Sequence, residues 1–344
     1  MDIFSILLAI LLFGLMIFFH ELGHFATAKW AGVKVNEFSI GMGPAIVSLK
    51  KGDTAYSLRL FPIGGFVAME GEDEESSDEH CFMACPVWKR IIITSAGGIM
   101  NIILGLALVA VLTNGMELLG TRYVAGFEEN AATAKYLETG DEIISVNGEK
   151  TKSYNDIIYS MIRDEDGVMS MDVVRNGKEI HLDDVRFNKE DKDDGAKSII
   201  LDFSFYGVRP TFLGKVKYSF DWTISLIKLV WHSLADIVTD NFTLNKLSGP
   251  IGVTEIISET AHSKNYDDLI FIVALITINL GVFNLIPLPA LDGGRIFFMI
   301  IELIRGKPIN QKAESMIHTA GMALLMALAI YVAYNDIVKI VLKG

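Results

Sequence analysis

The sequence predicts a polytopic α-helical membrane protein with four transmembrane helices, a membrane-associated β-hairpin and one inserted α+β domain. Of its 344 residues, 51% are hydrophobic, and the mean hydropathy of +0.38 is high for a soluble protein. Four windows are almost free of charge, and each reaches the roughly 20 residues that a spanning helix needs. These windows are residues 3–28, 91–116, 269–291 and 316–335.

The first window has two interpretations, a secretory signal peptide and a retained transmembrane helix. A signal peptide begins with basic residues and ends at a small-residue cleavage site. Asp2 is the only charged residue before His20, and no such site follows the apolar run. We therefore expect a transmembrane helix.

Lysine and arginine residues indicate the orientation in the membrane. Several lie in residues 30–90 and 295–315, which join the first window to the second and the third to the fourth, whereas the segment before the first window has none. The positive-inside rule places both segments in the cytosol, and residues 117–268 outside. Lys339 and Lys343 run against this rule. The net charge of −12 argues against nucleic acid as a partner, and the sequence does not indicate an oligomeric state.

Residues 45–67 alternate apolar and polar side chains around the turn Lys51-Gly52-Asp53, which predicts a β-hairpin. Open-edged backbone at membrane depth must be covered by protein or water, so we expect the hairpin in a cavity between helices or against the membrane. The acidic segment 70–80 that follows is expected to be a solvated loop. Cys81 and Cys85 are the only cysteines, and together with His80 they make a weak metal site at most.

The soluble region of the chain resembles a PDZ domain. Its segment "LETGDEIISVNGEK" (137–150) combines a Gly-Asp turn, a short strand and an Asn-Gly hairpin turn. The alternative is another small α+β domain. We expect the boundaries at 1–116 (N-terminal membrane region), 117–208 (PDZ-like domain), 209–268 (amphipathic helix and connector) and 269–344 (C-terminal membrane region). Within the connector, residues 211–240 have helical apolar spacing and are expected to lie in the membrane interface.

The motif "HELGH" (20–24) carries the chemistry. On a helix, His20 and His24 lie four residues apart on one face, where both can bind one Zn²⁺. Glu21 stands beside them as a candidate general base for a metal-bound water. A pair of histidines can also be an ordinary component of a core. Ionisable groups inside a membrane helix cost several kcal/mol, however, which favours a functional role.

A catalytic zinc site needs a third protein ligand and one open position. Trp30 and Thr27 stand where a metzincin would have histidine and glycine. The segment "NLIPLPALDGGR" (284–295) instead offers Asp292 after an uncharged window, with two prolines that break the helix before it. Gly293-Gly294 would permit a close approach of the backbone to the metal. The alternative role of Asp292 is a helix cap.

These motifs together resemble the site-2 protease family of intramembrane zinc metalloproteases, and the bacterial regulator-of-sigma-E proteases in particular. Further matches are "PVWKRIIITSAGGIMNIILG" (86–105) and "SGPIGV" (248–253), so that the resemblance covers essentially the whole chain. Two features depart from the family pattern. Gly98 stands where the similar motif has proline, and the chain has room for a single PDZ-like domain where some relatives carry two.

The resemblance implies a role for each matching residue. His20, His24 and Asp292 would bind Zn²⁺, and Glu21 would act as general base and acid. Asn284 would contact the substrate backbone near the scissile bond. The hairpin would pair with an extended substrate through an edge formed by Ser57, Leu58, Arg59 and Leu60.

The expected function is hydrolysis of a peptide bond in the transmembrane segment of a single-pass protein, such as an anti-sigma factor or a signal-peptide remnant. The expected location is a bacterial cell membrane, with the zinc site toward the cytosol and the PDZ-like domain outside. A membrane-anchored PDZ binding module with a vestigial zinc site is the main alternative. The intact Glu21 favours an enzyme. A zinc transporter would need more intramembrane carboxylates than Glu21 and Asp292.

Overall fold

The computed structural model describes residues 3–72, 76–164, 166–191, 197–238, 249–263 and 265–343. Within these ranges four helices are long and apolar enough to cross a membrane. At most 44% of each apolar window is buried inside the protein, so much of the apolar surface is left to face lipid. The four helices are α1 (Ile3–Ala31), α2 (Val87–Gly115), α6 (Tyr266–Leu285) and α8 (Gln311–Lys343).

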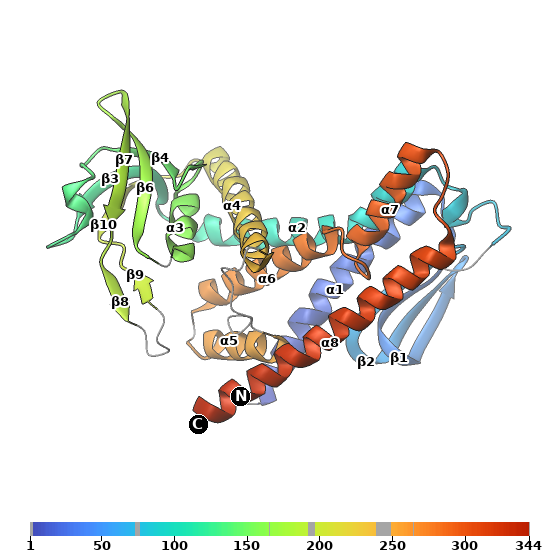
Figure 1. Cartoon of the computed structure of the whole chain (residues 1–344). Helices are drawn as coiled ribbons and strands as arrows, with labels where there is room; N and C mark the ends of the chain where they lie inside the picture. Colours follow the sequence, from blue (N-terminus) through green and yellow to red (C-terminus); the bar gives the residue numbers. More distant parts are fainter. Residues whose placement is uncertain are drawn as a thin grey trace. The chain divides into compact units, whose positions relative to one another are not determined.

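The chain divides into two compact units, Met1–Leu108 with Val230–Gly344, and Val109–Leu229. The first unit contains α1, α6, α8 and most of α2 (Figure 1). It also holds the strands β1 (Val35–Lys51) and β2 (Thr54–Met69) and the helices α5 (Pro250–His262) and α7 (Asp292–Arg305).

The predicted hairpin is present and is longer than expected. The second half of β1 pairs with the first half of β2 around a turn at Gly52, where φ is 62°. Gly43 and Gly64 both have φ near 87°, a backbone conformation open to glycine, and each lies where a strand bends. The bends let the first half of β1 pair on both sides, as Phe38 does with Tyr56 and with Val67. The segments therefore lie in the order 45–51, 54–59, 35–40 and 65–69.

For Ser57 and Leu58, this order corrects the expectation that residues 57–60 form a free edge. Ser57 pairs with both Ser39 and Ser48, and Leu58 with both Ile40 and Val47. The apolar alternation identified the strand, but it carries no information about which strands flank it. Among the described residues, the two outer segments of this order, 45–51 and 65–69, pair on one side only.

Two prolines and two glycines shape the start of α7. The expected helix over 269–291 ends at Leu285, because Pro287 and Pro289 cannot continue it. A Cβ atom on Gly293 would lie 2.1 Å from the Ile286 carbonyl oxygen, so only glycine lets α7 fold back on the preceding loop. The two glycines thus permit this tight turn, and the approach of their backbone to a metal stays a prediction. Asp292 is the first residue of α7.

A cluster of buried apolar residues holds the first unit together near the end of α1. It joins α1, β1, α2 and α7. Its members are Ala28, Ala31, Val33, Val35, Phe82, Ile93 and Met299. Elsewhere in this unit, the buried Asp336 carboxylate of α8 accepts hydrogen bonds from the N–H groups of Gly249 (2.9 Å) and Gly252 (3.0 Å) at the start of α5. Ser248, the first residue of the "SGPIGV" match, lies outside the described residues.

The second unit is an α+β structure, as predicted. Its strands are β3 (Leu119–Phe127), β4 (Glu142–Val146), β5 (Glu149–Lys150), β6 (Val168–Arg175), β7 (Lys178–Arg186) and β10 (Phe203–Val208), beside the short pair β8 (Lys189–Asp191) and β9 (Lys197–Ile199). They form a sheet in the order β10-β3-β4-β6-β7, with β5 paired to β4. Helix α3 (Tyr154–Arg163) begins with a capping box of Ser153 and Asp156. Both Asn-Gly turns have positive φ, as such hairpin turns require.

Helix α4 (Phe212–Val238) covers most of the predicted amphipathic segment, of which residues 239–240 lie outside the described residues. One face packs on α3, where Trp222 Nε1 donates a 2.7 Å hydrogen bond to the Tyr159 hydroxyl. The apolar stripe that predicted the helix is on another face, since Phe220 and Trp231 are more than half exposed. An exposed apolar stripe is what a helix in the membrane interface would present to lipid. The interfacial position of α4 therefore stays a prediction.

Candidate metal centre and active site

Three potential ligands from two distant segments meet at one point in the first unit. His20 and His24 come from the membrane helix α1, and Asp292 comes from the start of α7. Their Nε2 atoms are 3.2 Å apart and lie 3.3 and 3.4 Å from Asp292 Oδ2. With bonds of about 2.0–2.1 Å, neighbouring ligand atoms of a tetrahedral Zn²⁺ are separated by roughly 3.3–3.4 Å. The triangle therefore fits zinc without rearrangement.

The surroundings of the triangle also fit a cation. Asp292 Oδ2 is buried and accepts no hydrogen bond from the described residues. The Nδ1 atom of His24 lies 2.9 Å from the Ile93 carbonyl oxygen, to which it can only donate. Nδ1–H donation leaves Nε2 of His24 as a lone-pair donor that points to Asp292 and His20. Within the described portion of the chain, no other group of three metal-binding side chains comes together, and that includes His80 with the cysteines.

Helix α2 supplies the wall behind the histidines. A Cβ atom on Gly97 would lie 2.3 Å from His24 Nε2 and 2.6 Å from His20 Cε1, so a side chain there would displace both rings. Gly98, where the similar motif has proline, faces α6: its Cβ would lie 2.8 Å from the Gly281 carbonyl oxygen. The absence of a side chain at Gly98 thus lets α2 and α6 pack closely.

Asn101 lies one turn further along α2 and is fully buried. Its Nδ2 is 3.5 Å from Nδ1 of His20, and its Oδ1 has no partner among the described residues. Neither Gly97 nor Asn101 was predicted from the sequence. The available signal was their spacing of four residues, which places them on one face of a membrane helix.

Glu21 lines a cavity of about 170 Å³ together with the three candidate ligands. Its carboxylate accepts a hydrogen bond from the backbone N–H of Val67. A Cβ on Gly65 would lie 3.2 Å from the Glu21 side chain and 2.9 Å from the Ser39 carbonyl oxygen, so glycine lets β2 come this close to α1. The one-sided segment 65–69 of the sheet is therefore the region that borders the cavity.

The other residues proposed from the resemblance lie outside this cavity. Ser57, Leu58, Arg59, Leu60 and Asn284 are not among its lining residues. Arg59 is engaged within the sheet, where it forms a 2.7 Å ion pair with Glu37 and lies over the ring of Phe66. Asn284 is half-buried on the last turn of α6.

Two charged lining residues were not expected. Arg295 of α7 forms an ion pair with Glu72, and both border the metal cavity. The acidic segment 70–80 is thus partly held in place, since Asp78 also forms a 2.9 Å ion pair with Lys34. Residues 73–75 of that segment lie outside the described residues.

A membrane helix with His-Glu-x-x-His, completed by a carboxylate from a second helix, defines a class of membrane-embedded metallopeptidases. The chain belongs to peptidase family M50, whose family model matches residues 8–328. It is therefore a multi-pass membrane protein and a zinc metalloendopeptidase of the site-2 protease type, as the resemblance indicated.

Individual relatives match over nearly their whole length. A Clostridium acetobutylicum protein whose name assigns it to the zinc metalloproteases is 35% identical, with 98% of both chains covered. The regulator of sigma-W protease RasP of Bacillus subtilis is 31% identical, with 98% of this chain and 99% of RasP covered. The zinc metalloprotease RasP of Geobacillus kaustophilus is also 31% identical, with 97% and 98% covered.

Proposed function

We propose that the protein carries out regulated intramembrane proteolysis, in which it cleaves a peptide bond within the transmembrane segment of a single-pass membrane protein. The observation that supports this most directly is the ligand triangle, since His20 and His24 lie on membrane helix α1 and not in a soluble domain. A relative is named as a regulator of sigma-W, which makes an anti-sigma factor a reasonable substrate class beside signal-peptide remnants. The positive-inside rule supports a cytosol-facing site and an extracytoplasmic PDZ-like domain over 117–208.

In this proposal His20, His24 and Asp292 hold Zn²⁺. When bound, the metal polarises the scissile carbonyl and lowers the pKa of water to about 7. Glu21 takes the proton of the attacking water and passes it to the leaving amine. The backbone N–H of Val67 holds the Glu21 carboxylate at the cavity wall until a substrate enters.

Asn101 is proposed to set the tautomer of His20. If the Asn101 amide is turned by half a rotation, its unpartnered oxygen accepts the Nδ1–H of His20. Nε2 of His20 then carries a lone pair toward the metal, as Nε2 of His24 does through the Ile93 carbonyl. Both histidines would thus be oriented by a second hydrogen bond, which is the usual arrangement for metal-binding histidines.

The substrate is proposed to add as a strand to the segment 65–69 of β2. A transmembrane helix uses all of its amides internally, so a segment that unwinds for cleavage needs replacement partners. Strand addition supplies them through the main chain, with little dependence on side chains. The Val67 N–H, which now binds Glu21, would be one such donor. Asn284 would reach the substrate backbone only after the cavity widens, because it is not a lining residue in this structure.

The test is cleavage of a model single-pass substrate by the purified protein in lipid vesicles. Glu21→Gln is expected to keep zinc and fold while cleavage falls by more than about a hundredfold, because an amide cannot accept the proton. Turnover within tenfold of the wild type would move the base to another residue. Substrate binding without cleavage by the wild-type, zinc-loaded protein would favour the alternative of a binding module.

A further inference from the structure

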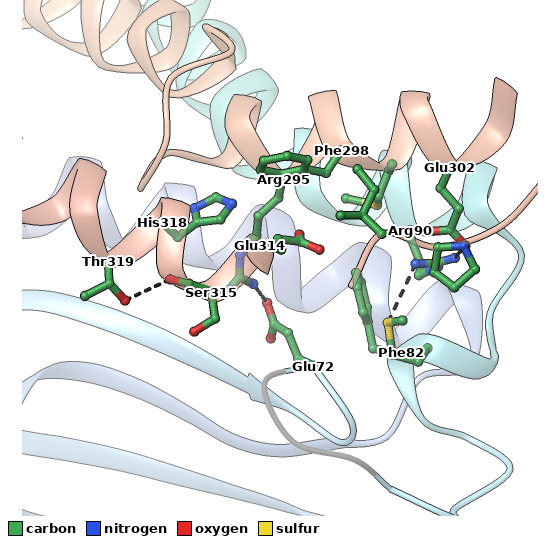
Figure 2. A pocket seen from close by; sticks show the side chains of 14 residues that line it. Glu72, Phe82, Arg90, Arg295, Phe298, Glu302, Glu314, Ser315, His318 and Thr319 are labelled. Atoms are coloured by element: carbon green, nitrogen blue, oxygen red, sulfur yellow. Dashed lines mark hydrogen bonds and ion pairs between the residues drawn. The ribbon is translucent and has the colours of Figure 1, made fainter. Parts of the chain in front are cut away.

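A second cavity, of about 310 Å³, adjoins the metal cavity. Its walls come from the acidic segment, the start of α2, α7 and the first turns of α8, with Arg295, Glu314 and His318 around one space (Figure 2). Glu72 and Arg295 line both cavities, so the ion pair between them forms the shared boundary. A chain lying along residues 65–69 of β2 and continuing past Glu72 would pass from the first cavity into the second.

Among the described residues that line the second cavity, the carboxylates outnumber the cationic side chains by one. Arg90 is paired with Glu302 at 2.6 Å, and Arg295 is paired with Glu72. His318 accepts a 3.0 Å hydrogen bond at Nδ1 from the Ala290 N–H, so its imidazole is neutral. Glu314 is left as a third carboxylate that forms no ion pair with another described residue.

The walls also offer apolar surface next to this charge. Phe298, Met299 and Ile309 line the cavity beside the polar groups. Such a combination suits a side chain with an aliphatic stem and a cationic head. The lining residues fall within or directly beside the two segments, 30–90 and 295–315, that the lysine and arginine distribution places in the cytosol.

We propose that this cavity is a subsite for a lysine or arginine side chain from the cytosolic flank of the substrate, with Glu314 as its charge partner. The same positive-inside rule that orients this protein also enriches the cytosolic flanks of its substrates in lysine and arginine. The subsite would thereby set the depth at which a transmembrane segment is presented to the metal. The proposal rests on the proposed intramembrane cleavage.

The experiment compares two model substrates, one with lysines in its cytosolic flank and one with glutamines at the same positions. Glu314→Gln is expected to lower kcat/KM roughly tenfold for the lysine substrate, the value of a hydrogen bond to a charged group, and to leave the glutamine substrate unchanged. Glu314→Lys should in turn favour a substrate with glutamates in the flank. Glu79→Gln, which removes an exposed carboxylate from the acidic segment 70–80, is the matched control and should affect neither substrate.

If Glu314→Gln lowers kcat/KM equally for both substrates, Glu314 has only a structural role. If it lowers kcat/KM for neither substrate, Glu314 does not take part in recognition. Either result overturns the subsite. Binding of the two substrates to Glu21→Gln protein, with and without Glu314→Gln, decides the subsite independently of turnover. If the wild type cleaves neither substrate, the proposed function fails, while preferential binding of the lysine substrate through Glu314 would still support the subsite.

Discussion

The guanidinium of Arg90 donates a 2.6 Å hydrogen bond to the carboxylate of Glu302, and the two side chains are only 6% and 15% exposed. Arg90 is in the first turn of α2, and Glu302 is near the end of α7. The pair therefore ties the helix that backs the histidines to the helix that carries Asp292. A buried pair of this kind matters most for stability when one partner is removed.

Glu302→Ala is expected to destabilise the protein by about 3–5 kcal/mol, because it leaves the Arg90 charge buried without a partner. Thermal unfolding in detergent micelles would measure the loss. The double variant Arg90→Met/Glu302→Leu should recover much of the stability, since it removes both charges. Equal stability of Glu302→Ala and the wild type would show that the pair does not hold these helices.

Asp292→Ala should abolish stoichiometric zinc binding, because two histidines alone make a weak site. Metal analysis of the purified protein is expected to give about one zinc per chain for the wild type. Asp268→Ala, which removes an exposed carboxylate at the start of α6, serves as the control and should retain the metal. Full zinc content and activity in Asp292→Ala would refute the assignment.

Asn101→Leu is expected to weaken zinc affinity by roughly 10–100-fold, the usual effect of losing an orienting hydrogen bond to a ligand. Competition with a chelator would measure this change directly, apart from any activity. Asn101→Asp retains an acceptor for the His20 Nδ1–H and should restore most of the affinity. If Leu and Asp variants bind zinc equally well, Asn101 only fills space.

Val67→Pro removes the outward N–H of the segment 65–69 without removing a bond within the sheet, because that N–H faces Glu21. Cleavage should fall roughly tenfold, the value of about one backbone hydrogen bond, while zinc stays bound. Val67→Ala keeps the N–H and should remain close to the wild type. By contrast, Ser57→Pro should disrupt the sheet, since Ser57 is paired on both sides. Unimpaired cleavage by Val67→Pro would exclude this segment as the docking edge.

The candidate ligands could be selected from the sequence because helix geometry alone brings His20 and His24 to one face. Asp292 was visible as a carboxylate directly after an uncharged window. Asn101 was not, because "AGGIMN" reads as an ordinary membrane helix until one knows which face of α2 meets α1. The spacing of residues in the sequence selects the candidate metal ligands. The orientation of those side chains depends on how the helices pack, which the spacing does not show.

The β-sheet shows where pattern reasoning reaches its limit. Alternation located strands on both sides of Gly52, but glycine bends fold each strand into two segments. Those bends place Ser57 and Leu58 inside the sheet and leave the segments 45–51 and 65–69 at its two edges. A period of two reports which face a side chain occupies, and it does not report the order of strands.

The position of Asp292 in the chain has a consequence for biogenesis. Every pairing in the first unit's sheet falls within residues 35–69, so this layer can form while the ribosome is still making the second transmembrane helix. His20 and His24 have been synthesised by then, but Asp292, proposed as the third ligand, follows only when α7 emerges. With the proposed zinc site, a nascent chain that stops short of residue 292 would lack one ligand and would not yet be able to cleave a substrate.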